Sequence, residues 1–331
     1  MIFVTGGTGL VGANLLLLLV EKNNKIRALK RANSNIRMVE KFFKQNKSQE
    51  LFHKIEWIEG DLLDITFLPI ALQGIKTIYH TAAHVSFNEK DADDIIENNV
   101  TGTENLINEA IDSGIEEFIY VSSIAAMDDL NPITKLIDEK STWNNDISHS
   151  TYAISKYRAE MEVWRGSQEG LNVIVINPSV IIGALDGKRE SERIFKDSVL
   201  NQYAPTGGTG FIDVRDVAKI IINLHEKKIY NQKFILNAEN RSYFSVLNYV
   251  ASKKNRSIKK ISNQTLKGLQ YITYAGQFFG LPYLNKATYK ALTNFIKYDN
   301  TKIISTLDYQ FIPVNEAIDY HYINYQKNSS K

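Results

Sequence analysis

The first twenty residues place a short apolar strand, a glycine loop and an apolar helix directly one after another. Gly6, Gly9 and Gly12 recur at every third position of the loop, a spacing one residue different from the commoner G-x-G-x-x-G fingerprint. Glycine backbone can approach an anion where a Cβ would clash, and a helix start presents free N–H groups and a positive dipole end. The order of the three parts predicts a nucleotide site. A plain glycine turn between strand and helix is the alternative.

Short β-rich runs alternate with helical patterns through the first half of the chain. The candidate strands are residues 2–4, 26–29, 55–58, 77–80, 118–121 and 173–176, and the clearest helices are residues 93–112 and 152–168. Alternation of this kind gives a parallel sheet with helices on both faces, in which short strands can be wholly apolar. We therefore predict an α/β fold with a Rossmann-type, doubly wound parallel sheet.

The pattern changes after Pro178. A polar, irregular stretch is followed by a return to strand, helix and strand, and the chain is helical and aromatic-rich from about Asn240. We expect a dinucleotide-binding domain and a smaller, mainly helical substrate-binding subdomain that the return segment interrupts. The first comprises residues 1–182 and 211–238, and the second comprises residues 183–210 and 239–331.

A second glycine run tests the specificity of the first. Thr206–Gly210 repeats Thr5–Gly9 letter for letter. It precedes a strand instead of following one, and no helix starts directly behind it, so it lacks the geometry that binds anions. We expect a loop there.

Composition excludes several classes of site and partner. The chain has 331 residues, 39 Lys and Arg against 37 Asp and Glu, and a net charge of +2. No charge excess indicates nucleic acid or a membrane as a partner. The absence of cysteine excludes disulfides, thiolate catalysis and Cys-ligated zinc. With no pattern typical of a signal peptide and no apolar run near ~20 residues, we expect a cytoplasmic protein.

Tyr152 and Lys156 lie four residues apart in a segment of helical composition, so both side chains lie on one face. A phenol has a pKa of about 10, and an ammonium ~4 Å away supplies about 4 kcal/mol toward its ionisation at an effective dielectric of ~20. The pairing predicts a tyrosine that exchanges protons near neutral pH. A chance pair on a solvated helix face is the alternative, which Ser122 and Ser123 at an earlier strand end make less attractive.

Together these features resemble the extended short-chain dehydrogenase/reductases, the NAD(P)-dependent epimerase/dehydratase group, and within it the dihydroflavonol-reductase-like carbonyl reductases. The resemblance runs from Met1 to about Ala238. The segments that carry it are residues 5–12, 60–62, 80–83, 99–103, 121–123, 152–156, 177–178 and 211–218.

The resemblance implies roles for individual residues. Tyr152 would be the general acid/base, Lys156 would hold the nicotinamide ribose and lower the pKa of Tyr152, and Ser123 rather than Ser122 would bind the substrate carbonyl. Asn99 would shape the site. The other cofactor-binding residues that it implies are Thr5, Gly6, Gly9, Leu10, Val11, Gly12, Asp61, Leu62, Thr81, Ala82, Ala83, Val121, Asn177 and Pro178.

Structural alternatives stay open for three polar residues. Asp61, which the resemblance places at the adenine, is also compatible with a helix N-cap, and Asn99 with a satisfied polar group in a helix. His80 is compatible with a hydrogen bond at a strand end. His80 and His84 lie four apart, but no third ligand follows from the spacing, so we expect no metal site.

The end of the second predicted strand bears on cofactor choice. An acidic residue there would indicate NAD, whereas a basic residue accommodates the 2′-phosphate of NADP. Residues 29–34 contain no acid, and Arg31 resembles the arginine that selects NADP in this family. A guanidinium binds phosphate in a bidentate manner. We expect NADP rather than NAD, with a solvated basic strand end as the alternative.

The leading function is an NADP-dependent oxidoreductase acting on a small-molecule aldehyde, ketone or alcohol. A nucleotide-sugar epimerase or dehydratase fits less well, because Ile124 and Ala125 replace the Asp-Glu pair of dehydratases and Thr151 replaces the proline typical of epimerases. A catalytically silent nucleotide sensor is the third possibility. The resemblance also implies a homodimer.

The substrate pocket is expected from three parts of the chain: residues 123–143, residues 179–210 and the helices beyond Asn240. The last part is rich in aromatic residues, namely Tyr271, Tyr274, Phe278, Phe279, Tyr283 and Tyr289. We expect them to pack the core of a helical subdomain. If some line the pocket instead, the substrate is apolar or aromatic.

Overall fold

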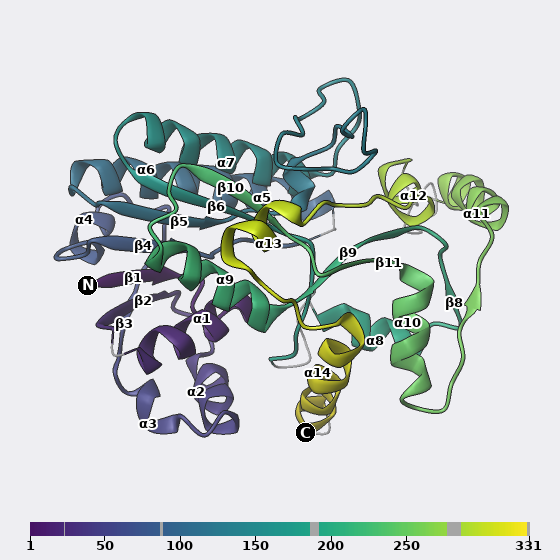
Figure 1. Cartoon of the computed structure of the whole chain (residues 1–331), viewed down its shortest axis with the longest axis horizontal. Helices are drawn as coiled ribbons and strands as arrows, with labels where there is room; N and C mark the ends of the chain where they lie inside the picture. The colour runs from purple at the N-terminus through teal and green to yellow at the C-terminus, as the bar shows by residue number, and fades with distance from the viewer. Residues whose placement is uncertain (23, 87–88, 186–191, 277–285, 330–331) are drawn as a thin grey trace.

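The computed structural model describes residues 1–331 apart from residues 23, 87–88, 186–191, 277–285 and 330–331 (Figure 1). Seven strands form the central sheet: β1 Ile2–Thr5, β2 Ile26–Lys30, β3 Ile55–Glu59, β4 Thr77–His80, β5 Glu117–Val121, β6 Asn172–Pro178 and β10 Gln232–Leu236. Their order is β10–β6–β5–β4–β1–β2–β3, and every neighbouring pair is parallel. The predicted Rossmann-type sheet is confirmed.

Both faces of this sheet are covered, which explains its nearly continuous apolar strands. Adjacent residues point to opposite faces, so Val4 joins the core under one helical layer and Phe3 joins the core under the other. The first layer contains α1 Leu10–Glu21, α2 Ile36–Gln45, α3 Gln49–Phe52 and α9 Val214–Glu226, and the second contains α4 Leu68–Ala71, α6 Gly102–Asp112 and α7 Thr151–Gln168. Short segments before α6 and α7 complete this half, namely η1 Glu89–Asp91, α5 Ala92–Ile96, η2 Glu97–Thr101 and η3 Ile124–Ala126.

The order of the strands reverses beside β1. From β1 the chain continues outward through β2 and β3, and then crosses back to β4 on the other side of β1. In open α/β sheets, ligands bind beyond the carboxyl ends of the strands at such a switch point. The glycine loop follows β1 directly and therefore lies there.

A second region extends to one end of the molecule (Figure 1). Its strands are β7 Val180–Ile182, β8 Tyr203–Ala204, β9 Gly208–Asp213, β11 Glu239–Ser242 and β12 Lys259–Lys260. Its helices are α8 Arg193–Leu200, α10 Tyr243–Ser252, α11 Asn263–Gly276, α12 Lys286–Thr293 and α14 Val314–Ser329, while α13 Thr301–Leu307 packs back on β10 of the central sheet.

The return segment differs from the prediction in its first strand. α9 and β10 rejoin the sheet and its helical layer, whereas β9 pairs with β7 and β11 in a separate three-stranded sheet. Thr206–Gly210 is not wholly a loop, since β9 begins at Gly208. A Cβ at Gly208 would lie 2.5 Å from the Arg241 carbonyl oxygen. The glycines there allow a neighbouring backbone to approach closely. Such close packing and an anion site can require the same glycine-rich sequence.

Candidate active site

The loop between β1 and α1 turns at Gly6, whose φ of +68° is a conformation that favours glycine. The Gly9 N–H donates to the Gly6 carbonyl at 2.7 Å, and α1 begins at the next residue. The first N–H groups of a helix have no intrahelical partner, and the first turn of α1 contains no acidic residue that would repel an anion. The turn therefore fits a pyrophosphate.

Close packing explains two of the glycines. A Cβ at Gly6 would lie 2.5 Å from the Ala82 nitrogen, and a Cβ at Gly12 would lie 2.1 Å from the Gly6 carbonyl oxygen. The segment after β4 thus rests on the glycine turn, and the Thr81 hydroxyl donates to the Thr5 carbonyl at 2.7 Å. Of the other residues predicted here, Leu10 is buried, Val11 is half-buried and Ala83 is exposed.

His80 carries a hydrogen-bond chain whose direction is fixed. The Thr103 hydroxyl donates to the Asn99 carbonyl at 2.6 Å, so its oxygen accepts from His80 Nε2 at 2.9 Å. His80 Nδ1 then accepts from the Thr5 hydroxyl at 2.6 Å, and that oxygen accepts from the Ala82 N–H at 3.3 Å. Burial lowers the pKa of His80 to about 3, in agreement with the neutral ring that the chain requires. The structure therefore shows His80 as the strand-end hydrogen bonder that the sequence allowed.

α7 brings the tyrosine and lysine to the carboxyl end of β5. The phenol of Tyr152 is hydrogen-bonded to the hydroxyl of Ser123, the second residue after the end of β5. Lys156 is buried, and its Nζ donates to the Val121 carbonyl at 2.7 Å and lies 4.5 Å from the centre of the Tyr120 ring. The three side chains predicted to carry the chemistry are therefore gathered in one place.

The expected lowering of the Tyr152 pKa is not found in this structure. Burial raises the pKa of Tyr152, and the hydrogen bond with Ser123 offsets only part of that effect. Lys156 directs its ammonium at the Val121 carbonyl, and burial lowers its own pKa to about 7. An ammonium that is itself costly to charge supplies little toward ionising a buried phenol.

The sequence prediction missed a buried carboxylate. Glu160 is 2% exposed and accepts from the Ser122 hydroxyl at 2.6 Å and from Asn177 Nδ2 at 2.8 Å. Its charge raises the pKa of Lys156 against the effect of burial. Asn177 Nδ2 also donates to the Ser123 carbonyl at 3.0 Å. The four-residue spacing that joins Lys156 to the tyrosine extends one turn further to Glu160, which is the signal that could have found it.

Asn99 lies in η2, a π-helical turn between α5 and α6. Its side-chain oxygen accepts from the His84 N–H at 2.6 Å, and its amide donates to the His84 carbonyl at 3.0 Å and to the Ser155 hydroxyl at 3.0 Å. The side chain thus ties the segment after β4 to α7. This arrangement matches the alternative of a satisfied helix polar group.

Arg31 and Asp61 meet at the carboxyl ends of β2 and β3. Arg31 Nε lies 3.2 Å from Asp61 Oδ2, and the guanidinium also donates to Asn98. Asp61 Oδ1 accepts from the Leu63 N–H at 3.1 Å within a turn, and the next helix, α4, begins only at Leu68, so Asp61 is not a helix N-cap. A guanidinium has five N–H donors, and these contacts leave donors for a phosphate. Leu62 is buried in the core under α6.

An aromatic stack borders the site. The Trp143 ring lies between His149, at a centroid distance of 3.7 Å, and Tyr157 of α7, at 4.5 Å, with interplanar angles of 20° and 10°. His149 Nε2 lies 2.5 Å from Asp128 Oδ2. The stack fixes the segment after η3 against α7, one residue beyond Lys156. The sequence gave no sign of this stack.

Part of the predicted pocket lies outside the described residues, namely residues 186–191 with Phe278, Phe279 and Tyr283. Tyr271 is 65% exposed and Tyr289 half-buried, so these two do not form a closed aromatic core.

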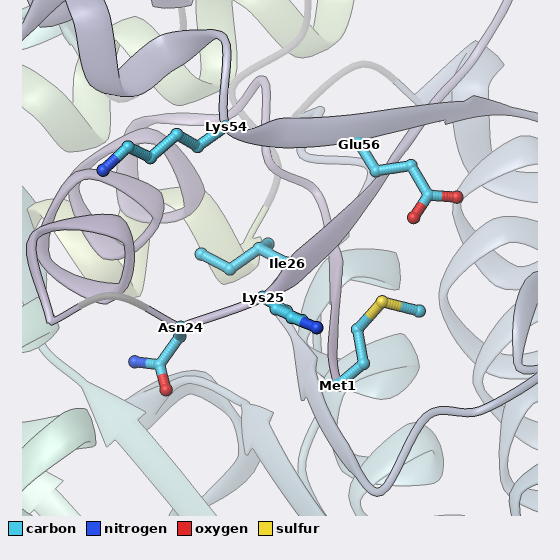
Figure 2. A pocket seen from close by; sticks show the side chains of 6 residues that line it. All are labelled: Met1, Asn24, Lys25, Ile26, Lys54 and Glu56. Atoms are coloured by element: carbon cyan, nitrogen blue, oxygen red, sulfur yellow. The ribbon is translucent and has the colours of Figure 1, made fainter.

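The described residues also line surface hollows away from the gathered hydroxyls and Lys156. Figure 2 shows a surface hollow lined by Met1, Asn24, Lys25, Ile26, Lys54 and Glu56. These residues lie at or near the amino ends of β1, β2 and β3, at the edge of the sheet opposite the glycine turn. Within the described part of the chain, no group of three His, Cys, Asp or Glu residues is placed to hold a metal ion. None of the described helices has both the length and the apolar character needed to cross a bilayer.

Comparisons with known proteins give one family. The model of the NAD dependent epimerase/dehydratase family matches residues 2–235. A Synechocystis sp. protein whose name points to dihydroflavonol 4-reductase is 36% identical over 219 residues, which cover 65% of this chain and 60% of that protein's length. Cinnamoyl-CoA reductase 1 of Petunia hybrida is 28% identical over 246 residues, covering 68% and 69%. The crystal structure of gox2253 superposes with a TM-score of 0.83 at 26% identity, covering 99% of this chain and 98% of that one.

Proposed function

Since the chain belongs to the NAD dependent epimerase/dehydratase family, and is an NAD(P)-dependent oxidoreductase of the extended short-chain dehydrogenase/reductase type, we propose that it reduces a small-molecule aldehyde or ketone with NADPH. The observation that carries this proposal is the hydrogen bond between Ser123 and Tyr152 beside the buried Lys156. These hydroxyls lie at the carboxyl ends of the strands, the edge of the sheet that also carries the glycine turn.

The side chains have complementary tasks in this proposal. When bound, NADPH supplies a hydride to the carbonyl carbon of the substrate. Ser123 donates a hydrogen bond to the carbonyl oxygen, and Tyr152 transfers its proton to that oxygen as the alcohol forms. The raised pKa of Tyr152 keeps the phenol protonated at neutral pH, which suits reduction. Water then returns a proton to the phenolate.

Three parts of the chain support NADP as the cofactor. The glycine turn and the start of α1 suit the pyrophosphate, Lys156 suits the nicotinamide ribose, and Arg31 suits the 2′-phosphate. Asp61 is then placed to share Arg31 with that phosphate or to meet the adenine. We also propose that residues 183–210 and 239–331 hold the substrate.

The test is NADPH oxidation with a panel of aliphatic and aromatic aldehydes and ketones. We expect turnover of at least one carbonyl, and a loss of about 10²- to 10⁴-fold in kcat in Tyr152→Phe, because the proton donor is removed. NADPH affinity should change little. Tyr230→Phe, which removes a phenol that donates to Glu117 at the amino end of β5, is the matched control and should retain full activity.

Two other outcomes would each favour a different function. Tight NADPH binding without oxidation by any carbonyl would overturn the reductase proposal and favour a nucleotide sensor. Conversion of a nucleotide-sugar as fast as any carbonyl, with the cofactor present only in catalytic amounts, would favour an epimerase.

A further inference from the structure

Charge is divided unevenly along the chain. Residues 240–298 contain ten Lys and Arg residues and no Asp or Glu, while the rest of the chain contains 29 basic and 37 acidic residues. The net charge of +2 therefore combines a segment of +10 with a remainder of −8. A field of one sign over one part of a surface attracts partners of the opposite charge.

The fold gathers most of the described elements of this segment at one end of the molecule. α10, α11, α12 and β8 lie together there, on the side away from β3 (Figure 1). β12 pairs with β8, so Lys259 lies beside Tyr203. The exposed basic side chains of this end are Lys254, Arg256, Lys259, Lys260, Lys267, Lys290 and Lys297. Lys253 is neutralised by Asp319 of α14 at 2.5 Å, whereas Lys259 and Lys267 form no ion pair with the described residues.

Large apolar side chains are exposed on the same end. Leu269 and Ile272, 40% and 65% exposed, lie three residues apart on one face of α11, and the neighbouring Tyr271 is 65% exposed. Tyr203 on β8 is 54% exposed, and Phe295 after α12 is 44% exposed. Single exposed apolar residues are ordinary, but here several lie on elements that also carry exposed lysines, a combination that fits a contact surface.

We propose that this end, defined by β8, β12, α11 and the start of the segment after α12, docks on an anionic membrane surface. Lysines attract acidic headgroups, at about 1 kcal/mol for each residue near the surface, and the apolar side chains enter the interface. Leu269 and Ile272 favour lipid over nucleic acid, because aliphatic side chains gain only where they leave water. Eight of the ten basic residues are lysines, point charges without the fork by which arginine grips a single phosphate. The expectation of no membrane partner followed from the whole-chain charge, which conceals this segment.

The test is sedimentation of the full chain with vesicles of phosphatidylcholine alone or with 30 mol% phosphatidylserine added (about a third acidic lipid, enough for a clear surface potential). We expect binding only to the acidic vesicles and release by added salt, because screening weakens the attraction. Lys259→Glu with Lys267→Glu should lower the affinity at least about 30-fold. Leu269→Ser with Ile272→Ser should weaken vesicle binding at every salt concentration.

A matched control separates this surface from net charge. Lys25→Glu with Lys54→Glu changes the net charge equally at the hollow of Figure 2, on another part of the molecule, and should leave vesicle binding unchanged. Equal binding to neutral and acidic vesicles, or equal loss in both charge-reversal variants, would overturn the proposal. The proposal would also be overturned if the chain bound an RNA duplex or polyglutamate more tightly than the acidic vesicles, and if Leu269→Ser with Ile272→Ser left that binding unchanged. NADPH affinity, measured in parallel, reports folding and is independent of the outcome.

Discussion

Glu160 and Lys156 are coupled through charge on one face of α7. Burial lowers the pKa of Lys156 to about 7, and the Glu160 carboxylate opposes that shift. Lys156 loses its positive charge as the pH rises through this value, so any ligand that needs the ammonium binds more weakly above it. Glu160 therefore extends the pH range over which the site is charged.

Glu160→Gln removes that support. We expect the pH at which NADPH affinity falls to half to move downward by about one unit, because the ammonium then deprotonates at lower pH. Fluorescence titration of NADPH between about pH 5.5 and 9 measures the midpoint. Glu162→Gln is the control on the same helix, since Glu162 pairs with Arg165 at 2.8 Å near the surface. A midpoint that stays fixed in Glu160→Gln would show that the carboxylate is only structural.

Arg31 is the residue on which cofactor preference depends. We expect NADPH to bind more tightly than NADH, and Arg31→Ala to lower that ratio by about 10- to 100-fold, because a charge-assisted hydrogen bond to the 2′-phosphate is lost. Arg31→Lys keeps the charge without the fork and should fall between the two. Competitive titration of both cofactors measures the ratio. Equal affinities in the parent protein would contradict the NADP assignment.

At the scale of elements, the glycine loop joins β1 to α1 by close contact. A Cβ at Gly12 would lie 2.1 Å from the Gly6 carbonyl oxygen, so Gly12→Ala must displace the helix from the turn. We expect it to lower the free energy of unfolding by about 3 kcal/mol, the upper range for overpacking. Urea unfolding measures this change.

Gly114→Ala is the comparison for Gly12→Ala. Gly114 ends α6 with a φ of +66°, and nothing lies within 4 Å of an added Cβ. Only backbone strain is incurred, which costs about 1 kcal/mol. Equal losses in the two variants would mean that the contact in the glycine turn relaxes easily.

The elements of the central sheet could be predicted because their signals are local. A strand buried on both faces need not alternate polar and apolar residues, and the bounds predicted for residues 77–80 are those of β4. β9 and β11 are different, since residues 208–213 pair with residues 239–242 and 180–182 through contacts distant in sequence. Their glycines fit a loop equally well.

The candidate site shows the same division. Spacing of four brings Tyr152 and Lys156 to one helix face, and strand order brings Ser123 near them. The directed chain through His80 and the stack on Trp143 could not be foreseen, because each joins three segments whose relative placement only the fold defines. The direction of the Tyr152 pKa shift likewise depends on burial, which spacing does not report.

At the scale of the molecule, Asp213 joins the second region to the helical layer of the sheet. It is fully buried at the end of β9, caps α9 by accepting from the Arg215 N–H at 2.8 Å, and accepts from His321 Nε2 of α14 at 3.1 Å. The Arg215 guanidinium binds the same carboxylate at 2.6 Å and lies 3.9 Å from the centre of the Tyr320 ring. One carboxylate thus fixes β9, α9 and α14 together.

The pKa of Asp213 shows how much this junction contributes. Burial alone would raise that pKa, yet the hydrogen bonds from His321 and Arg215 lower it to about 2. The folded value lies below the unfolded value of about 3.9, so the stabilisation is complete above pH ~4 and is lost as the pH falls through ~2. A shift of this size corresponds to about 2 kcal/mol.

Asp213→Asn should therefore lower the free energy of unfolding by at least about 2 kcal/mol at pH 7, because Arg215 is also left without its counter-charge. The difference from the parent protein should narrow as the pH falls from about 4 toward 2, where the parent carboxylate is itself protonated. Urea unfolding across this range measures the difference, and hydrogen exchange should show that α14 opens first. Asp197→Asn, which breaks the surface pair with Arg193 on α8, is the control and should cost no more than about 0.5 kcal/mol. If the difference stayed constant down to pH 3, the charge of Asp213 would not be what secures α14, because asparagine can still cap α9.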